Sequence, residues 1–153
     1  MMMKQKNIAS FIVIFWAGFV SAISFMEAWL KFQAPGITVP LGLGIGRLVF
    51  GAMNYVEWIL LLGFLLTVFV SAKKRKFENR KTWILLTLVA IILFLQTFWM
   101  LPVLDERAAL IIAGKEPPKS MLHIFYIAAE FIKVISLILL AFAIQKEKFQ
   151  RSI

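Results

Sequence analysis

The sequence predicts an all-α integral membrane protein whose four transmembrane helices form an antiparallel bundle. Hydrophobic residues make up 61% of the 153-residue chain, more than a soluble domain of this size can bury. The mean hydropathy is correspondingly high, at +0.87. Four apolar stretches, at about residues 8–30, 47–70, 82–102 and 121–144, are each close to the roughly 20 residues that a span needs. Together they use most of the chain, so residues 1–153 are treated as a single membrane domain.

Positive charge is concentrated at the segment from Ser71 to Lys81, which holds six Lys and Arg residues between the second and third apolar stretches. Short loops rich in Lys and Arg stay in the cytoplasm. This basic loop therefore predicts that both chain termini are cytoplasmic. We expect the membrane to be the inner membrane of a bacterium. Eleven of the 17 cations fall on the predicted inner side, so we expect anionic lipid of the inner leaflet as the partner, and no nucleic acid.

The first apolar stretch follows a short basic tail that contains Lys4 and Lys6. A cleaved signal peptide is the alternative interpretation, since Val20-Ser-Ala22 has the small residues of a cleavage site. The stretch is longer than the apolar region of a typical signal peptide, so we interpret it as the first span.

Glycine and proline are frequent before the second span, where Pro35, Pro40 and the run Gly42-Leu-Gly-Ile-Gly46 follow one another. This composition predicts a flexible or partly re-entrant loop, with the helix beginning at about Arg47. In the third span, Pro102 predicts a kink or a stop. The residues that follow could form a short interfacial helix between Asp105 and Gly114, or continue the third span beyond the proline.

Polar side chains inside the predicted spans are the candidate functional residues, because an ionisable group in hydrocarbon is costly unless it is paired, protonated or hydrated. Counted from the outer ends, they fall in the outer halves of the spans, whereas the inner halves are almost wholly apolar. This pattern predicts a polar, acid-lined pocket that is open to the outer side and closed below. Its candidate ligand-binding residues are Glu27, Arg47, Asn54, Glu57, Gln96, His123, Tyr126, Glu130 and Lys133.

Two carboxylates, Glu57 and Glu130, are expected to approach one another across the bundle axis. Both lie at a similar depth, and each sits on the polar stripe of its helix, with His123 and Tyr126 farther out. Two carboxylates so placed cannot both stay ionised without a compensating cation. Lys133 and Arg47 are the candidates to supply that charge.

Three interpretations of function stay open. The bundle could bind or move a cation or small amphiphile in the acid-lined pocket. It could be a membrane-embedded enzyme that uses His123 and the carboxylates as acid–base groups or metal ligands. It could also be a structural or accessory subunit whose polar groups satisfy one another. No nucleophile motif accompanies the lone histidine, so a non-enzymatic role without a cofactor is favoured. A homo-oligomer or another membrane partner is left open.

The two predicted hairpins show a weak tandem repeat, in which Glu57-Trp-Ile aligns with Glu130-Phe-Ile. Such hairpins would be related by an axis along the membrane normal. The stretch Glu27-Ala-Trp-Leu-Lys-Phe-Gln-Ala-Pro-Gly36, with Gly44-Ile-Gly-Arg-Leu-Val-Phe-Gly-Ala-Met-Asn54, resembles a small family of four-helix integral membrane proteins. That family is known mainly as a domain of unknown function and includes a human transmembrane protein linked to platinum-drug resistance. The resemblance covers about the first half of the chain. It implies the four-helix architecture and no catalytic residue.

Overall fold

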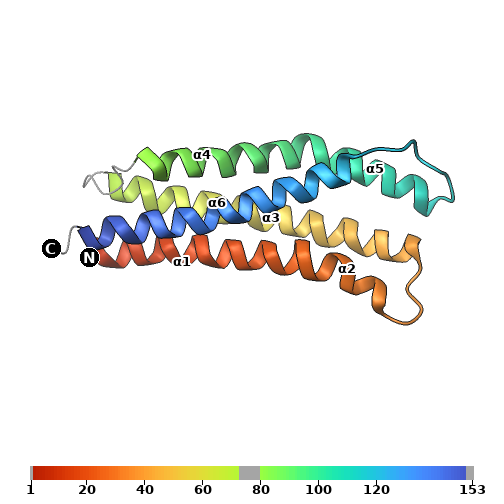
Figure 1. Cartoon of the computed structure of the whole chain (residues 1–153), viewed down its shortest axis with the longest axis horizontal. Coiled ribbons are helices and arrows are strands. Elements are labelled where there is room, and N and C mark those ends of the chain that lie inside the picture. Colours follow the sequence, from red (N-terminus) through yellow and green to blue (C-terminus); the bar gives the residue numbers. More distant parts are fainter. Residues whose placement is uncertain (1, 73–79, 151–153) are drawn as a thin grey trace.

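The computed structural model describes residues 2–72 and 80–150, and the side chains of residues 7–69 and 80–146. Within this part, the chain forms four long helical rods that run back and forth along one axis (Figure 1). The predicted all-α four-helix bundle is confirmed. Each rod contains a segment long and apolar enough to cross a membrane: Asn7–Gln33, Val39–Phe69, Arg80–Ile112 and Leu122–Lys146.

Two of the four rods change helix type along their length. The first consists of α1 (Met2–Ser21), the π-helix η1 (Ala22–Glu27), α2 (Ala28–Leu30) and a 3₁₀ turn, η2 (Lys31–Gln33). The second is the single helix α3 (Val39–Ala72). The third consists of α4 (Arg80–Leu95), the π-helix η3 (Gln96–Met100) and α5 (Leu101–Ile112). The fourth is α6 (Leu122–Gln150).

The helix α6 packs against both α1 and α4, while α1 also packs against α3, and α3 against α5. The start of α1, the end of α3, the start of α4 and the end of α6 all lie at one end of the bundle (Figure 1). We call it the terminal end. The opposite end carries the connections at residues 34–38 and 113–121, and we call it the loop end. Both termini therefore belong to the same side of a membrane that the rods cross.

Large apolar side chains cover the outside of the bundle, including Phe11, Leu66, Phe94 and Phe142, each more than half exposed. Soluble monomers rarely expose apolar surface on this scale. Such a surface is suited to contact with lipid. The helices are suited to it as well, because each helix satisfies its backbone hydrogen bonds internally.

The second rod begins at Val39, so the expected loop before Arg47 is wrong. Pro40 lies at the start of the helix, where its missing N–H is not needed. Two of the glycines serve close packing. A Cβ on Gly42 would collide with the ring of Phe32, and one on Gly46 would lie 3.2 Å from Lys31 Nζ. The reversal before the helix uses Gly36 instead, at φ 81°.

The third rod continues through Pro102 to Ile112, so the proline neither stops the helix nor begins a separate one. Of the two alternatives, continuation is correct. A proline in a helix lacks an N–H, and its ring crowds the carbonyl four residues earlier. The widened π-helical turn at Gln96–Met100 lies directly before this position and accommodates both effects. The helix ends at Ile112, and Gly114, two residues later, adopts φ 73°.

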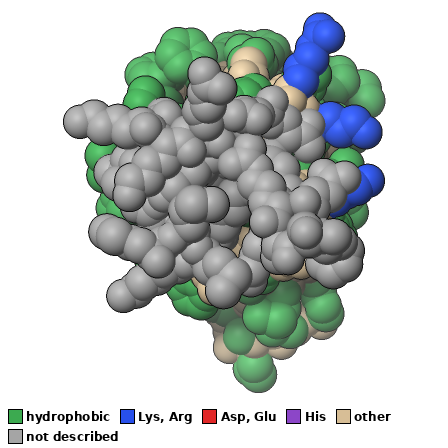
Figure 2. Space-filling view, turned by 90° about the vertical axis from the view of Figure 1, so that its left-hand side faces the viewer, with side chains coloured by type: hydrophobic (Ala, Val, Ile, Leu, Met, Phe, Trp, Pro, Cys, Tyr) green, Lys and Arg blue, Asp and Glu red, His purple; other side chains and the backbone are tan. Residues whose placement is uncertain are grey.

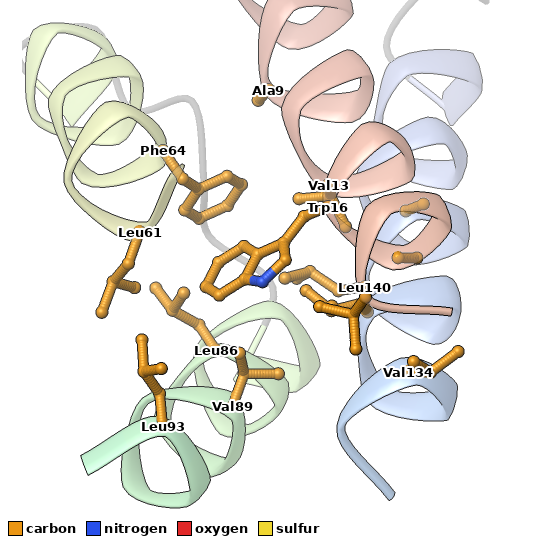
Figure 3. Close-up of a cluster of buried hydrophobic side chains, with 14 of the residues drawn as sticks. Ala9, Val13, Trp16, Leu61, Phe64, Leu86, Val89, Leu93, Val134 and Leu140 are labelled. Carbon is orange, nitrogen blue, oxygen red and sulfur yellow. The ribbon is translucent and has the colours of Figure 1, made fainter. Parts of the chain in front are cut away.

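Buried apolar side chains form two clusters along the bundle. The larger occupies the terminal half, where Trp16 points from α1 into the centre, with Phe64 of α3, Leu86 of α4 and Leu140 of α6 around it (Figure 3). Ser10, Thr82 and Ser136 are buried polar residues in this otherwise mainly apolar half. The smaller lies in the loop half and consists of Met100, Leu122 and Tyr126, with Phe50, Leu101 and Leu104 against it.

The basic loop predicted between the second and third spans falls largely at residues 73–79, outside the described residues. Arg80 and Lys81 belong to the described part, lie at the start of α4 and are exposed. The terminal end, seen face-on in Figure 2, carries Lys and Arg side chains along one side of its rim, and no described Asp or Glu side chain is visible in that view.

Candidate functional site

A lysine and two glutamates meet inside the bundle, and all three residues are 0% exposed. Lys133 Nζ lies 2.6 Å from Glu57 Oε1 and 3.2 Å from Glu130 Oε1. It also donates a hydrogen bond of 2.7 Å to Gln96 Oε1. An ammonium group has three protons to donate, and these contacts use all of them. The predicted approach of Glu57 and Glu130 is confirmed, and Lys133 is the cation that links them.

Two further side chains donate hydrogen bonds to these glutamates. Gln96 Nε2 donates to Glu130 Oε1 at 2.9 Å, and Trp16 Nε1 donates to Glu57 Oε1 at 2.9 Å. Each of the four rods therefore contributes to one hydrogen-bonded network. We call its five residues the central cluster: Trp16, Glu57, Gln96, Glu130 and Lys133.

Local helix geometry brings these side chains together. Glu130 and Lys133 are three residues apart on α6 and so lie on one face. Gln96 opens the π-helix η3, a helix type that often occurs at functional sites. The cluster lies near the middle of the rods rather than in the expected outer half, because the second rod begins before Arg47 and the third continues past Pro102. Ligand sites of membrane transporters are also found near the midplane.

The carboxylates of the cluster outnumber its cations. With ordinary protonation, Glu57 and Glu130 carry two negative charges and Lys133 one positive charge. Both Glu57 Oε2 and Glu130 Oε2 are buried without a hydrogen-bond partner. A buried charge without compensation is strongly unfavourable. The network is therefore incomplete by one positive charge, and two of its oxygens still lack a donor.

The cluster is enclosed in the described structure, so it differs from the open polar pocket that the sequence predicts. On the terminal side lies the apolar core around Phe64 and Leu140. Toward the loop end lies Tyr126, which is 3% exposed and one turn from Glu130 on the same face of α6. Phe50 packs edge-on against its ring, with centroids 5.8 Å apart.

A shallow groove of about 460 Å³ lies elsewhere, between α3 and α4, and its lining includes Leu61, Trp83, Leu86 and Phe94. The lining is apolar and contains none of the nine predicted site residues.

A second polar group lies beside the cluster and is self-contained. Thr97 Oγ1 accepts hydrogen bonds from Asn54 Nδ2 at 2.9 Å and from Trp58 Nε1 at 3.0 Å. Its hydroxyl lies 2.8 Å from the carbonyl oxygen of Leu93 and 3.1 Å from Asn54 Oδ1, both available as acceptors. Asn54 is thus satisfied by Thr97 and does not reach the carboxylates.

The other predicted site residues lie toward the loop end, away from the central cluster. Glu27 pairs with Lys31 at 3.1 Å, both partly exposed. Arg47 pairs with Asp105 across α3 and α5, with Nη2 2.8 Å from Oδ2. The expectation that Arg47 could answer a buried glutamate is therefore wrong. His123 is exposed on α6.

Sequence reasoning missed five partners in these contacts, namely Trp16, Lys31, Trp58, Thr97 and Asp105. Trp16 could have been found from its chemistry, because an indole N–H placed mid-span needs an acceptor. Asp105 lay in the segment whose helical state was undecided, so its position opposite Arg47 could not be deduced.

No group of three His, Cys, Asp or Glu residues lies close enough to hold a metal ion within the part of the chain that the structure describes. The chain matches no protein-family model, no curated protein and no solved structure. Its function is therefore inferred from the chemistry of the central cluster.

Proposed function

We propose that this chain is an integral membrane protein that binds or moves a cation at the central cluster, with Glu57 and Glu130 as the binding groups. One observation carries the proposal: two fully buried carboxylates share a single lysine, and each keeps an oxygen without a partner. Ionisable groups within a membrane commonly mark ion pathways and proton relays. A site short of one positive charge is suited to a monovalent cation.

A purely structural role is the alternative that this observation disfavours. Polar groups that only hold helices together are expected to satisfy one another, as Asn54 and Thr97 do. The central cluster does not reach that state, because its two carboxylates share one ammonium group. A cluster with a purely structural role could have balanced its charge with glutamine in place of either glutamate. A second buried carboxylate without its own cation destabilises the folded protein in a low-dielectric interior. Cation binding would give this second carboxylate a role.

Enclosure of the cluster favours a small cation over an amphiphile. Its glutamate, glutamine and lysine side chains are 0% exposed, and an amphiphile would need a cavity beside them. The enzyme alternative has little support here, because His123 is exposed and takes no part in the network.

We place the protein in a bacterial inner membrane, with the terminal end in the cytoplasm. Exposed Arg80 and Lys81 at the start of α4 support this orientation, as does the basic composition of the loop that precedes them. The expected lipid partner at this end is anionic.

The test is thermal unfolding of the purified protein in lipid nanodiscs, at constant ionic strength, while pH or the concentration of Na⁺, K⁺ or Li⁺ is varied. We expect the unfolding midpoint to respond to at least one of these cations or to protons. The response should be lost in Glu57→Gln and Glu130→Gln. It should persist in Glu106→Gln, which removes an exposed carboxylate. If both cluster variants respond as the wild type does, the proposal is wrong.

A further inference from the structure

We propose that the cation taken up by the central cluster is a proton, held by the pair Glu57 and Glu130, and that metal and organic cations are excluded. This inference rests on the proposed function and names the ligand of the same site. It assigns the protein to proton binding or proton movement within the membrane.

The first argument is that Lys133 already occupies the position a metal ion would take. Its ammonium nitrogen lies between the two carboxylates and also contacts Gln96 Oε1. A metal cation placed there would be repelled by this fixed charge. Only Glu57 Oε2 and Glu130 Oε2 remain without partners, whereas hard cations such as Mg²⁺ or Ca²⁺ take about six to eight oxygen ligands.

The second argument is access. A metal ion travels with water in its coordination shell, and the cluster is closed by apolar side chains on both sides. A proton can instead pass along hydrogen-bonding groups without opening the bundle. Tyr126 supplies a hydroxyl next to the cluster on the side of the loop end. On the terminal side, the packing around Trp16 and Phe64 is mainly apolar, and the buried hydroxyl of Ser136 donates to the carbonyl oxygen of Ile132 at 2.7 Å.

The third argument is the balance of charge and hydrogen bonds. A proton transferred from hydronium to one of the two free oxygens forms an O–H bond and leaves water behind. The cluster then holds one ammonium, one carboxylate and one carboxylic acid, and its net charge is zero. The new hydroxyl is also a hydrogen-bond donor, whereas before protonation both Oε2 atoms could only accept. Neighbouring carboxylates share a proton in this way in aspartic proteases.

The titratable groups that face the cluster are few. They are Glu57 from α3 and Tyr126, Glu130 and Lys133 from α6, while α1 and η3 contribute Trp16 and Gln96, which do not titrate. The remaining charged groups near the loop end pair elsewhere or are at least partly exposed. A proton bound at neutral pH inside this bundle would therefore belong to the two glutamates.

Infrared difference spectroscopy of the protein in nanodiscs of zwitterionic lipid tests the inference directly. At neutral pH, we expect the carbonyl band of about one protonated carboxyl group per chain. The band should disappear in Glu57→Gln and in Glu130→Gln and remain in Glu106→Gln. Each cluster variant leaves one carboxylate for one lysine, so both are expected to fold. If one fails to fold, the wild type and the other variant still provide the comparison.

Stability against pH provides a second measurement. Above about pH 4.3, the ordinary value for glutamate, an unfolded chain releases the proton that the folded cluster retains. The folded state then binds one more proton, so stability falls as pH rises. The unfolding equilibrium constant of the wild type should rise about tenfold per pH unit relative to Glu130→Gln, until the folded cluster also loses its proton.

Three outcomes are distinguishable when Na⁺, K⁺ or Li⁺ is added at constant ionic strength. A carboxylic acid band that no metal cation alters supports the proton assignment. A band that disappears as one of these ions binds, with release of a proton, overturns the assignment while the proposed cation site stands. Absence of the band, together with no effect of metal ions on the unfolding midpoint, overturns both proposals.

Discussion

Lys133 is the residue on which the charge balance of the cluster depends. Its ammonium group contacts Glu57, Glu130 and Gln96 and is 0% exposed. Replacing it by methionine keeps much of its volume but removes the cation of the central cluster, so the ionised carboxylate beside it loses its partner. Removing one partner of a buried ion pair typically costs about 3–5 kcal/mol. We expect Lys133→Met to lower the free energy of unfolding by about this amount, measured by denaturant titration in mixed micelles.

Two comparisons make this prediction specific. Lys119→Met, which removes an exposed cation near the loop end, should change stability by less than about 0.5 kcal/mol. Adding Glu57→Gln to Lys133→Met should restore part of the loss, because it removes one of the two carboxyl groups that contact the lysine in the wild type. Equal losses in Lys133→Met and Lys119→Met would show that the buried lysine has no special role.

For individual residues, the sequence predicts contacts from two properties: the depth of a polar side chain in its span and the helix face on which it lies. The prediction succeeds where both properties are correctly assigned. Glu57 and Glu130 meet because lipid forces the polar stripe of each helix inward. Gln96 and Tyr126 follow for the same reason. Arg47 and Glu27 find other partners near the loop end, where Asp105 and Lys31 can also reach them. Competition among such residues cannot be resolved without coordinates.

At the scale of helices, the two π-helices are the least predictable feature. Their last residues, Glu27 and Met100, are separated by the same number of residues as Glu57 and Glu130. Each π-helix lies in the first rod of a hairpin, which supports the predicted tandem arrangement of two hairpins. Pro102 accounts for the second π-helix. The first has no proline near it, and we have no physical account of its position.

Gly42 and Gly44 provide a matched test of how the first hairpin packs. Both lie in the first turns of α3, where alanine is favoured over glycine by about 1 kcal/mol. A Cβ at Gly44 meets nothing within 4 Å, whereas a Cβ at Gly42 collides with the ring of Phe32. We expect Gly44→Ala to stabilise the protein by up to about 1 kcal/mol. Gly42→Ala should be less stable than Gly44→Ala, because Phe32 must move.

The comparison can be made by thermal unfolding of both variants in the same nanodiscs. Restoring space with Phe32→Ala should reduce the difference between the two alanine variants. If Gly42→Ala and Gly44→Ala stabilise the protein equally, Phe32 does not pack on the start of α3 in the membrane.

At the scale of the whole molecule, the fold class follows from composition, because a chain this apolar must place its backbone in helices that span lipid. The ends of the rods do not follow in the same way. Gly42 and Pro102 would favour loops in a soluble protein, yet both lie within helices here. Water does not compete for the backbone groups of a membrane helix, so residues that break helices elsewhere are tolerated.

The orientation of the whole bundle is the remaining prediction, and it depends on charge at its two ends. The four rods bring both termini to one end (Figure 1), and the basic loop joins the second and third rods at that same end. Retention of short basic loops in the cytoplasm predicts that a reporter fused after Gly114 lies outside and one fused after Ile153 lies inside. Finding both reporters on one side would refute the topology.

The loop itself can be tested at residues 73–76, which lie outside the described part of the structure but within the basic segment of the sequence. Neutralising Lys73, Lys74, Arg75 and Lys76 together should lower the fraction of molecules in which the Gly114 reporter is outside, because the positive charge that holds the loop in the cytoplasm is reduced. Neutralising two cations beyond Gly114, at residues 115 and 119, should leave that fraction unchanged or raise it. Correctly inserted molecules should keep the unfolding midpoint of the wild type, since the central cluster lies far along the rods from this loop. An unchanged reporter distribution in the loop variant would mean that the orientation is set elsewhere in the chain.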